Sequence, residues 1–183
     1  MKFKEKSRMA DARGLDRTLN RLTHEILEKN KGTENLVIIG IRTRGEFIAK
    51  RLTEKIQEIE QKDIPIGVLD VVMYRDDFRQ KYKLPAVEVT DIPFAIDEKI
   101  VILVDDVIYT GRTIRAALDA LVDFGRAAKI QFAALVDRGH REMPIKADYV
   151  GKNLPTADDE EIRVKMKEVD SEDAILLVQR IDD

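Results

Sequence analysis

The sequence predicts an α/β fold, with a mainly parallel sheet flanked by helices in a single domain spanning residues 1–183. Segments typical of strands alternate with segments typical of helices along the chain. The strand segments are continuous runs of Val, Ile and Leu, as in strands that are buried on both faces. A length of 183 residues suits one domain of this class, and no internal repeat or linker divides it.

The first half of the chain predicts two helices and two strands. The first helix has an apolar stripe at helical spacing, formed by Leu15, Leu19, Leu22, Ile26 and Leu27. Asn30 and Gly32 favour its end. Residues 35–41 predict a buried strand, because the run is β-branched and too short for a helix. A second amphipathic helix starts near Thr43, and residues 66–73 predict another strand.

The second half continues the alternation. We expect a central strand over residues 100–104, a helix over 113–124, a strand over 130–136, and two short strands over 163–169 and 175–179 that form a small C-terminal hood. Two segments predict loops: residues 74–86, which are polar and charged, and the basic stretch 138–146. Long loops in compact domains are usually functional or disordered.

Composition and charge exclude several classes of protein. The chain has no cysteine, which excludes a disulfide scaffold, a zinc finger and thiol chemistry. The net charge of −3 excludes a polycation. Residues 1–29 nevertheless carry 8 Lys/Arg against 5 Asp/Glu, and residues 154–183 carry 4 against 10. A nucleic-acid partner therefore needs a local basic patch. With neither a signal peptide nor a membrane span, we expect a cytoplasmic protein without membrane partners.

The strongest signal for chemistry lies in residues 101–113, with the sequence V-I-L-V-D-D-V-I-Y-T-G-R-T. A buried strand delivers Asp105 and Asp106 to its carboxyl end, where ligands bind in parallel sheets. The helix that follows opens with backbone N–H groups and the hydroxyls of Thr110 and Thr113, which suit a phosphate. Carboxylates beside this cradle suit the hydroxyls of a ribose. The alternative is that two aspartates simply cap a helix, and the spacing is neither a Walker A loop nor G-x-G-x-x-G.

This segment resembles the phosphoribosyl-pyrophosphate (PRPP) motif of type I phosphoribosyltransferases. The resemblance implies that Asp105 and Asp106 contact the ribose hydroxyls, that residues 110–113 hold the 5′-phosphate, and that Mg²⁺ bridges sugar and pyrophosphate, with the two aspartates as candidate ligands. Residues 43–45 resemble the pyrophosphate loop, and residues 74–77 resemble the start of a mobile loop that closes over PRPP. The implied catalytic residues are Asp105, Asp106, Arg44 and Arg75. The implied substrate-binding residues are Thr43, Arg44, Gly45, Arg75, Asp105, Asp106, Val107, Ile108, Tyr109, Thr110, Gly111, Arg112, Thr113 and Arg138.

Two further segments narrow the resemblance to one branch of the family. Residues 137–142 and 147–153 resemble the bifunctional pyrimidine-operon attenuators that are also uracil phosphoribosyltransferases. This branch implies PRPP, uracil, UMP and UTP as ligands, with Arg138 holding the uracil. It also implies a pyrimidine-operon mRNA leader as partner, no DNA, and a homo-oligomer that is a dimer or larger.

The first helix carries a basic stripe opposite its leucines. Arg13, Arg17, Arg21 and His24 fall at i, i+4, i+8 and i+11, on one side of a helix. In the resembled branch this helix and the basic loop form an RNA-binding surface, which implies the residues Arg17, Asn20, Arg21, His24, Lys29, Arg141, Lys146 and Lys152. On charge alone, a solvated helix face is the more common explanation. Asn20, Lys29 and Lys146 depart from the branch's pattern, and Lys lacks the bidentate geometry of Arg.

Three functions therefore stay open. The first is a regulator that binds the leader RNA when uridine nucleotides are plentiful and also makes UMP from uracil and PRPP. The second is a salvage uracil phosphoribosyltransferase without RNA regulation. The third is an RNA-binding nucleotide sensor without significant catalysis, which the intact Asp105, Asp106, Arg44 and Arg75 disfavour.

Overall fold

The computed structural model describes residues 2–76 and 89–181. Its elements, in chain order, are β1 (Lys2–Ala10), α1 (Ala12–Asn30), β2 (Leu36–Ile41), α2 (Arg44–Glu60), β3 (Ile66–Leu69), η1 (Val72–Tyr74), β4 (Ile100–Ile108), α3 (Arg112–Leu121), η3 (Val122–Phe124), β5 (Lys129–Asp137), β6 (Tyr149–Asn153), β7 (Glu160–Lys165), α4 (Lys167–Asp170) and β8 (Ala174–Ile181). None of the helices in these ranges has the length and apolar content that a membrane span requires.

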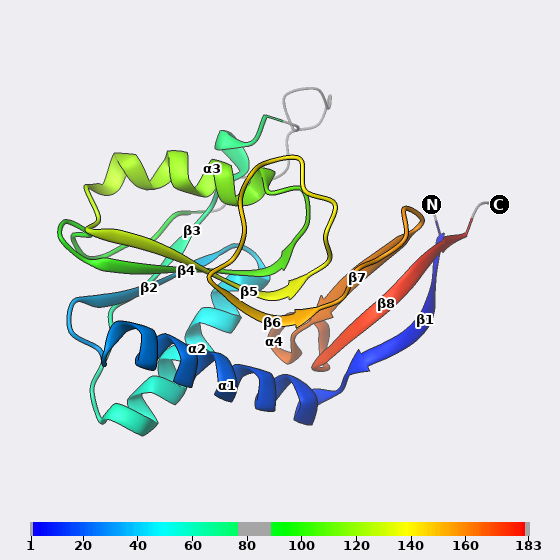
Figure 1. Ribbon diagram of the computed structural model, residues 1–183, viewed down its shortest axis with the longest axis horizontal. Coiled ribbons are helices and arrows are strands. Elements are labelled where there is room, and N and C mark those ends of the chain that lie inside the picture. Colours follow the sequence, from blue (N-terminus) through cyan, green and yellow to red (C-terminus); the bar gives the residue numbers. More distant parts are fainter. Residues whose placement is uncertain (1, 77–88, 182–183) are drawn as a thin grey trace.

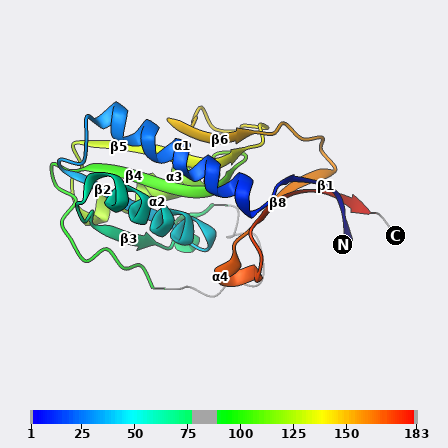
Figure 2. The ribbon, with the colours of Figure 1, turned by 90° about the horizontal axis from the view of Figure 1, so that it is seen from below.

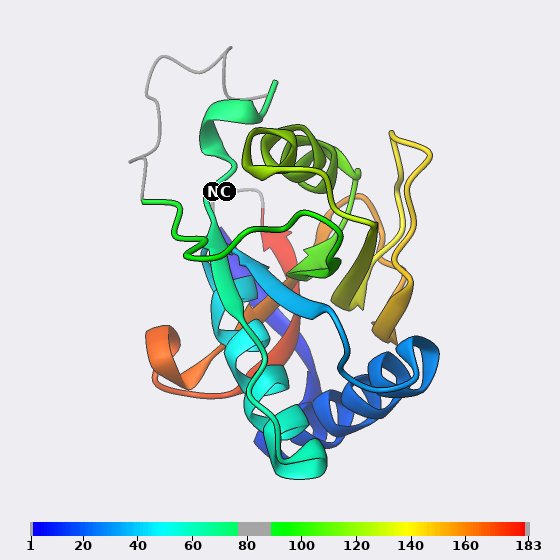
Figure 3. The same cartoon turned by 90° about the vertical axis from the view of Figure 1, so that its left-hand side faces the viewer.

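The main body is a five-stranded parallel sheet in the order β3-β2-β4-β5-β6. Helices α1 and α2 cover one face and α3 covers the other, as Figures 1 and 3 show. Successive residues of β4 alternate between two cores: Ile102 packs toward α1 and α2, whereas Val101 and Leu103 pack toward α3. The prediction of an α/β fold with a parallel sheet is confirmed.

A second, antiparallel sheet lies beyond the carboxyl ends of the parallel strands, as seen in Figures 1 and 2. Its strand order is β1-β8-β7, and we call it the hood. The predicted hood contained only two strands, over residues 163–169 and 175–179. The structure adds β1, which pairs with β8 from Lys2 opposite Ile181 to Ala10 opposite Ile175. The first strand of the chain therefore completes the hood.

Several predicted boundaries were wrong. The strand predicted over residues 66–73 ends at Leu69, because the carboxylate of Asp70 accepts a hydrogen bond from the Val72 N–H at 2.9 Å and the chain turns into η1. The central strand continues to Ile108, which pairs with Asp137 of β5. Residues 167–170, partly predicted as strand, form the short helix α4. The loop prediction for residues 77–86 lies outside the described residues.

Candidate active site

Two parallel strands bring their polar residues together at one edge of the sheet. Asp105 and Asp106 lie near the carboxyl end of β4, and Arg44 begins α2 directly after β2. Because β2 and β4 are neighbours, these residues meet where parallel sheets bind ligands. Arg44 is close enough to Asp106 that each influences the other's charge. The structure thus places these three predicted catalytic residues in one site.

Asp105 and Asp106 form a pair of adjacent carboxyl groups, of which Asp105 is buried and Asp106 is half-buried. Asp105 is only 7% exposed. Burial raises the pKa of both groups, and the charge of Asp106 raises the pKa of Asp105 further. Nearby Arg75 and Arg44 oppose these shifts at Asp105 and Asp106 respectively. A site that holds two such groups favours a ligand that brings hydroxyl donors or positive charge.

The loop that follows β4 forms a cradle at the start of α3. Gly111 caps the helix with a φ of +92°, a conformation that a side chain disfavours. The Arg112 N–H donates to the hydroxyl of Thr110 at 3.3 Å, and Arg75 donates to the hydroxyl of Thr113 at 2.7 Å. The backbone N–H groups of the first helical turn face this loop, which suits an anion. Arg75 therefore lies beside the predicted phosphate-binding hydroxyls.

The loop between β2 and α2 lies close to the backbone of β4. The peptide bond between Arg42 and Thr43 is cis, and Thr43 is the cap of α2. A Cβ atom added to Gly45 would lie 2.5 Å from the carbonyl oxygen of Val104. Only a glycine permits this approach, which brings Arg44 to the edge of the sheet.

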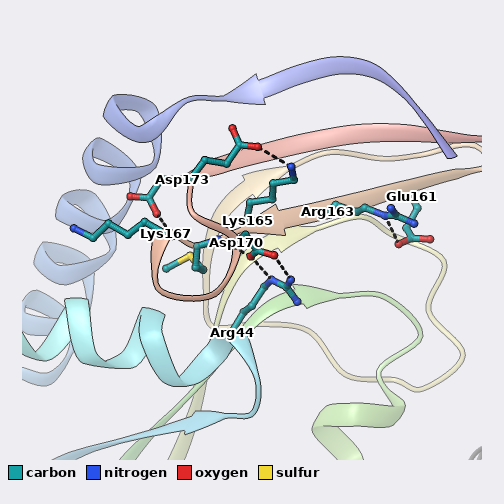
Figure 4. A network of polar contacts seen from close by, with 9 residues as sticks. Arg44, Glu161, Arg163, Lys165, Lys167, Asp170 and Asp173 are labelled. Carbon is teal, nitrogen blue, oxygen red and sulfur yellow. Dashed lines mark hydrogen bonds and ion pairs between the residues drawn. The ribbon is translucent and has the colours of Figure 1, made fainter.

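A groove of about 460 Å³ separates this edge of the sheet from the hood. Its lining residues are Arg44, Asp106, Val107, Glu161, Ile162, Arg163, Val164, Lys165 and Asp170. Arg44 donates to the carboxylate of Asp170, from Nε at 3.1 Å and from Nη2 at 2.8 Å, as Figure 4 shows. Asp170 was not among the predicted site residues, because an acidic turn between two strands carries no local signal for a partner 126 residues away.

Arg138, the predicted uracil contact, is 7% exposed and links the sheet to the hood. Its Nε donates to the hydroxyl of Thr156 at 3.0 Å, and its Nη2 donates to the carbonyl of Glu160 at 2.8 Å. The guanidinium also lies 4.0 Å from the centre of the Tyr109 ring. Arg138 therefore has a structural part in positioning the hood, and its contact with uracil stays a prediction.

The predicted RNA-binding residues of α1 lie beside β6, the edge strand of the parallel sheet (Figure 2). Arg21 donates to the carbonyls of Val150 and Gly151, at 3.1 and 2.5 Å. Lys29 pairs with Asp148 at 2.8 Å. These two basic residues hold α1 against β6 and the residue before it, so they stabilise this surface and also contribute positive charge to it.

Among the other members of the predicted RNA-binding set, Arg17, Asn20 and His24 are exposed and Lys152 is half-buried. Within the described residues, the side chains of Arg17, His24 and Lys152 make no hydrogen bond or ion pair. Asn20 donates to Asp16 at 3.3 Å. Lys152 extends from β6, next to α1. The structure thus gathers most of this set on one surface, which we call the α1–β6 face.

The basic loop 138–146 is fastened to the cradle instead of standing free. Arg141 bonds the carbonyl of Tyr109 at 2.8 Å and also contacts the carboxylate of Asp137. The backbone N–H groups of Glu142 and Met143 both donate to the carbonyl of Thr110, at 2.9 and 3.0 Å. The loop and the cradle are therefore joined by direct hydrogen bonds.

No cluster of three or more Asp, Glu or His side chains suitable for a metal ion occurs in residues 2–76 and 89–181. The candidate active site offers two adjacent carboxylates, those of Asp105 and Asp106. This donor set fits a Mg²⁺ ion that takes most of its ligands from a bound diphosphate.

Comparison with known proteins finds a matching domain family and relatives that align over nearly the whole chain. The phosphoribosyl transferase domain model matches residues 7–169. The bifunctional protein PyrR of Pelotomaculum thermopropionicum is 52% identical over 176 residues, which cover 96% of this chain and 97% of the relative. The bifunctional protein PyrR of Elusimicrobium minutum is 56% identical over 173 residues, which cover 94% and 97%.

Solved structures support the fold. A hypoxanthine-guanine phosphoribosyltransferase from Bacillus anthracis superposes with a TM-score of 0.70 at 22% identity, covering 97% of this chain and 99% of that one. The hypoxanthine phosphoribosyltransferase of Trypanosoma cruzi superposes with a TM-score of 0.73 at 17% identity, covering 97% and 98%. At these identities the likeness concerns the fold alone.

Proposed function

The chain belongs to the phosphoribosyltransferase family, and from this premise we propose that it transfers the phosphoribosyl group of PRPP to uracil, giving UMP and pyrophosphate. The observation that carries this proposal is the meeting of the Asp105–Asp106 pair, the cradle at Gly111 and Arg44 at one edge of the sheet. The identity of more than half with bifunctional proteins PyrR supports it.

The proposed reaction breaks the bond between the anomeric carbon and pyrophosphate and forms a bond to N1 of uracil. Positive charge develops on the ribose ring in the transition state, and the carboxylates of Asp105 and Asp106 stabilise it. The cradle holds the 5′-phosphate through backbone N–H groups and the hydroxyls of Thr110 and Thr113. Arg44 lies on the groove side of Asp106, where the leaving pyrophosphate carries its charge.

Mg²⁺ is the proposed cofactor, and when bound it would supply positive charge that neutralises the diphosphate. Asp105 and Asp106 are the candidate protein ligands, since a cation relieves the repulsion between two buried carboxylates. Arg75, held beside Thr113, adds positive charge on the other side of the ribose-phosphate.

A direct assay tests the transferase. The purified chain is incubated with PRPP, Mg²⁺ and radiolabelled uracil, and UMP formation is measured with orotate, hypoxanthine and guanine in parallel. We expect UMP formation that requires Mg²⁺ and is faster than transfer to any other base. Failure to form UMP, or a faster reaction with a purine, would contradict the proposal.

We propose a second function, the uridine-nucleotide-dependent binding of pyrimidine-operon leader RNA. The α1–β6 face supports it, because it gathers Arg17, His24 and Lys152 without internal partners among the described residues. The charged side chains of Arg17 and Lys152 suit RNA phosphates, and neighbouring polar side chains such as those of His24 and Asn20 suit the bases of RNA loops. Lys29 and Arg21 contribute charge from positions that also hold the face together.

The contacts between the cradle and the loop 138–146 support a direct coupling of the two functions. Phosphate bound at the cradle fixes Tyr109 and Thr110, whose carbonyls bind Arg141, Glu142 and Met143. The proposed effector UMP therefore orders the loop that carries Arg141 and Lys146. By linkage, RNA bound to the ordered loop tightens the binding of UMP to the same degree.

Binding of leader RNA from the protein's own pyrimidine operon, with and without UMP and across a salt series, tests this function. We expect sequence-dependent binding that UMP strengthens. Binding that is absent, or that is insensitive to UMP and to sequence, would favour the salvage enzyme without regulation. UMP-dependent RNA binding without transfer would favour the sensor. We also propose a homo-oligomer, at least a dimer, which sedimentation analysis would test.

A further inference from the structure

We propose that Asp170 is a positioning residue for the transferase: it holds Arg44 so that the open edge of the guanidinium faces the groove where pyrophosphate leaves. The inference rests on the proposed phosphoribosyl transfer. It assigns a part in that reaction to the turn between β7 and β8, to which the sequence analysis gave none.

The carboxylate of Asp170 is itself fixed in place. One oxygen accepts the backbone N–H of Met166 at 2.9 Å as well as the Nε–H of Arg44, and the other accepts the Nη2–H of Arg44 at 2.8 Å. The backbone N–H of Asp170 also bonds the Met166 carbonyl at 2.7 Å. Arg44 and Asp170 are 33% and 20% exposed, so the pair is partly shielded from water.

This bidentate contact leaves the other edge of the guanidinium open. A guanidinium has five N–H donors in a fixed plane. Asp170 takes the Nε–H and one Nη2–H, which leaves the Nη1 side for a second anion. Arg44, Asp106 and Asp170 all line the same groove, and Figure 4 shows Arg44 reaching from the start of α2 to the hood. Asp170 therefore orients Arg44 without occupying its groove-facing edge.

The same turn carries a natural control, Asp173. Its carboxylate accepts the backbone N–H of Lys167 at 2.8 Å and binds Arg51 of α2 at 3.0 and 2.8 Å. Arg51 follows Arg44 by two helical turns and does not line the groove between sheet and hood. Asp170 and Asp173 thus make similar contacts with the turn and with α2, although Arg51 is also held by Glu168, and only Asp170 acts on a residue of the proposed site.

The experiment compares Asp170→Asn with Asp173→Asn. Affinity for magnesium pyrophosphate is measured by calorimetry, and KM for PRPP, KM for uracil and affinity for UMP are measured beside it. We expect Asp170→Asn to weaken pyrophosphate binding and raise KM for PRPP on the order of tenfold, since a lost orienting partner misplaces the ligand-binding group. KM for uracil and affinity for UMP, neither of which carries pyrophosphate, should change less than about twofold in both variants.

A double variant separates positioning from general loosening of the fold. In the background of Arg44→Ala, the substitution Asp170→Asn should have no further effect on pyrophosphate affinity, because its effect passes through Arg44. Equal pyrophosphate affinity of wild type and Asp170→Asn would overturn the proposal, and so would an equal loss in Asp173→Asn. If the wild type neither binds magnesium pyrophosphate nor forms UMP, the proposed transferase fails first, and this inference fails with it.

Discussion

Charged side chains have opposite environments in two regions of the molecule. One region is the site at the carboxyl ends of the strands, and the other is the α1–β6 face. In the site, buried Asp105 and half-buried Asp106 lie side by side, and their loss of contact with water raises the pKa of both. On the α1–β6 face, Arg21 binds two carbonyls of β6, and Lys29 binds the carboxylate of Asp148, the residue just before that strand. One region holds like charges together, and the other uses its charges to join two elements.

This difference separates the effects of substitutions on stability from their effects on function. Removing a carboxylate charge from the site relieves electrostatic repulsion, so the folded state is preserved or stabilised. The same change lowers activity, because the charge takes part in the proposed reaction. Removing a paired cation from the α1–β6 face breaks contacts that hold α1 in place. On this face, a substitution that weakens RNA binding indicates a direct RNA contact only if the residue makes no hydrogen bond or ion pair within the protein.

The largest expected effect is that of Asp106→Asn on turnover. The amide keeps the shape but removes the charge that stabilises the ribose in the transition state, and kcat should fall about 10²–10³-fold. Steady-state UMP formation measures it. Asp119→Asn, an exposed acid on α3 paired with Arg115, is the control and should leave kcat unchanged. Near-normal turnover in Asp106→Asn would remove this residue from the mechanism.

A pair of substitutions tests the α1–β6 face. Arg21→Gln should lower the free energy of unfolding by about 1–2 kcal/mol, because it removes charge-assisted bonds to two carbonyls of β6. Arg17→Gln should leave stability within about 0.5 kcal/mol, as is usual for exposed sites. Both should weaken RNA binding, as measured by filter retention, and urea unfolding measures stability. Equal stabilities of the two variants would contradict the structural part assigned to Arg21.

The cradle is sensitive to its backbone conformation. Gly111→Ala should destabilise the fold by about 1–2 kcal/mol, because an L-residue at φ +92° is strained and its Cβ would lie 3.0 Å from the Met143 Cβ. KM for PRPP should rise as well, which kinetic assays measure. Gly32→Ala also places a side chain at positive φ, with no atom within 4 Å of its Cβ, and should leave KM unchanged. A rise in KM in both variants would contradict a specific effect on the cradle.

The smallest effect concerns pH. The pKa of Asp105 is raised in the folded state, so the folded state favours its protonated form. Its contribution to stability is therefore full below the ordinary pKa of an aspartate and is lost as pH rises through the raised value. Asp105→Asn should have a higher Tm than the wild type at pH 8, and the difference should shrink toward pH 4. A difference that is constant between these pH values would refute the assignment.

The sequence was sufficient for the parallel sheet and for the motif on it, because both have local signals. Continuous apolar runs identified β2, β4 and β5. Two strands that were not predicted lack such a run: β1, with the sequence KFKEKSRMA, is charged along its length, and β6 is short and contains Gly151. Their strand conformation comes from pairing with other strands, the distant β8 for β1 and the nearby β5 for β6.

The site residues also fall into those with a local sequence signal and those that only folding brings to the site. Asp105, Asp106 and residues 110–113 stand in one segment, so their spacing alone predicts a phosphate and ribose site. Asp170 joins the site only because β7 and β8 return the chain to Arg44. Arg138 was predicted to contact uracil on resemblance, but its hydrogen bonds to Thr156 and Glu160 are visible only in the folded chain.

The strand order of the hood determines when parts of the fold can form during synthesis. Strand β1 is synthesised long before β8, the strand with which it pairs in the described part of the hood, because β8 begins at Ala174. At about 5–20 residues per second, β1 waits on the order of ten to thirty seconds for that partner. Asp170 is synthesised just before β8, so Arg44 also acquires its partner late. The groove is therefore completed only after β7 and β8 have been synthesised, and a nascent chain has the cradle well before it has the hood.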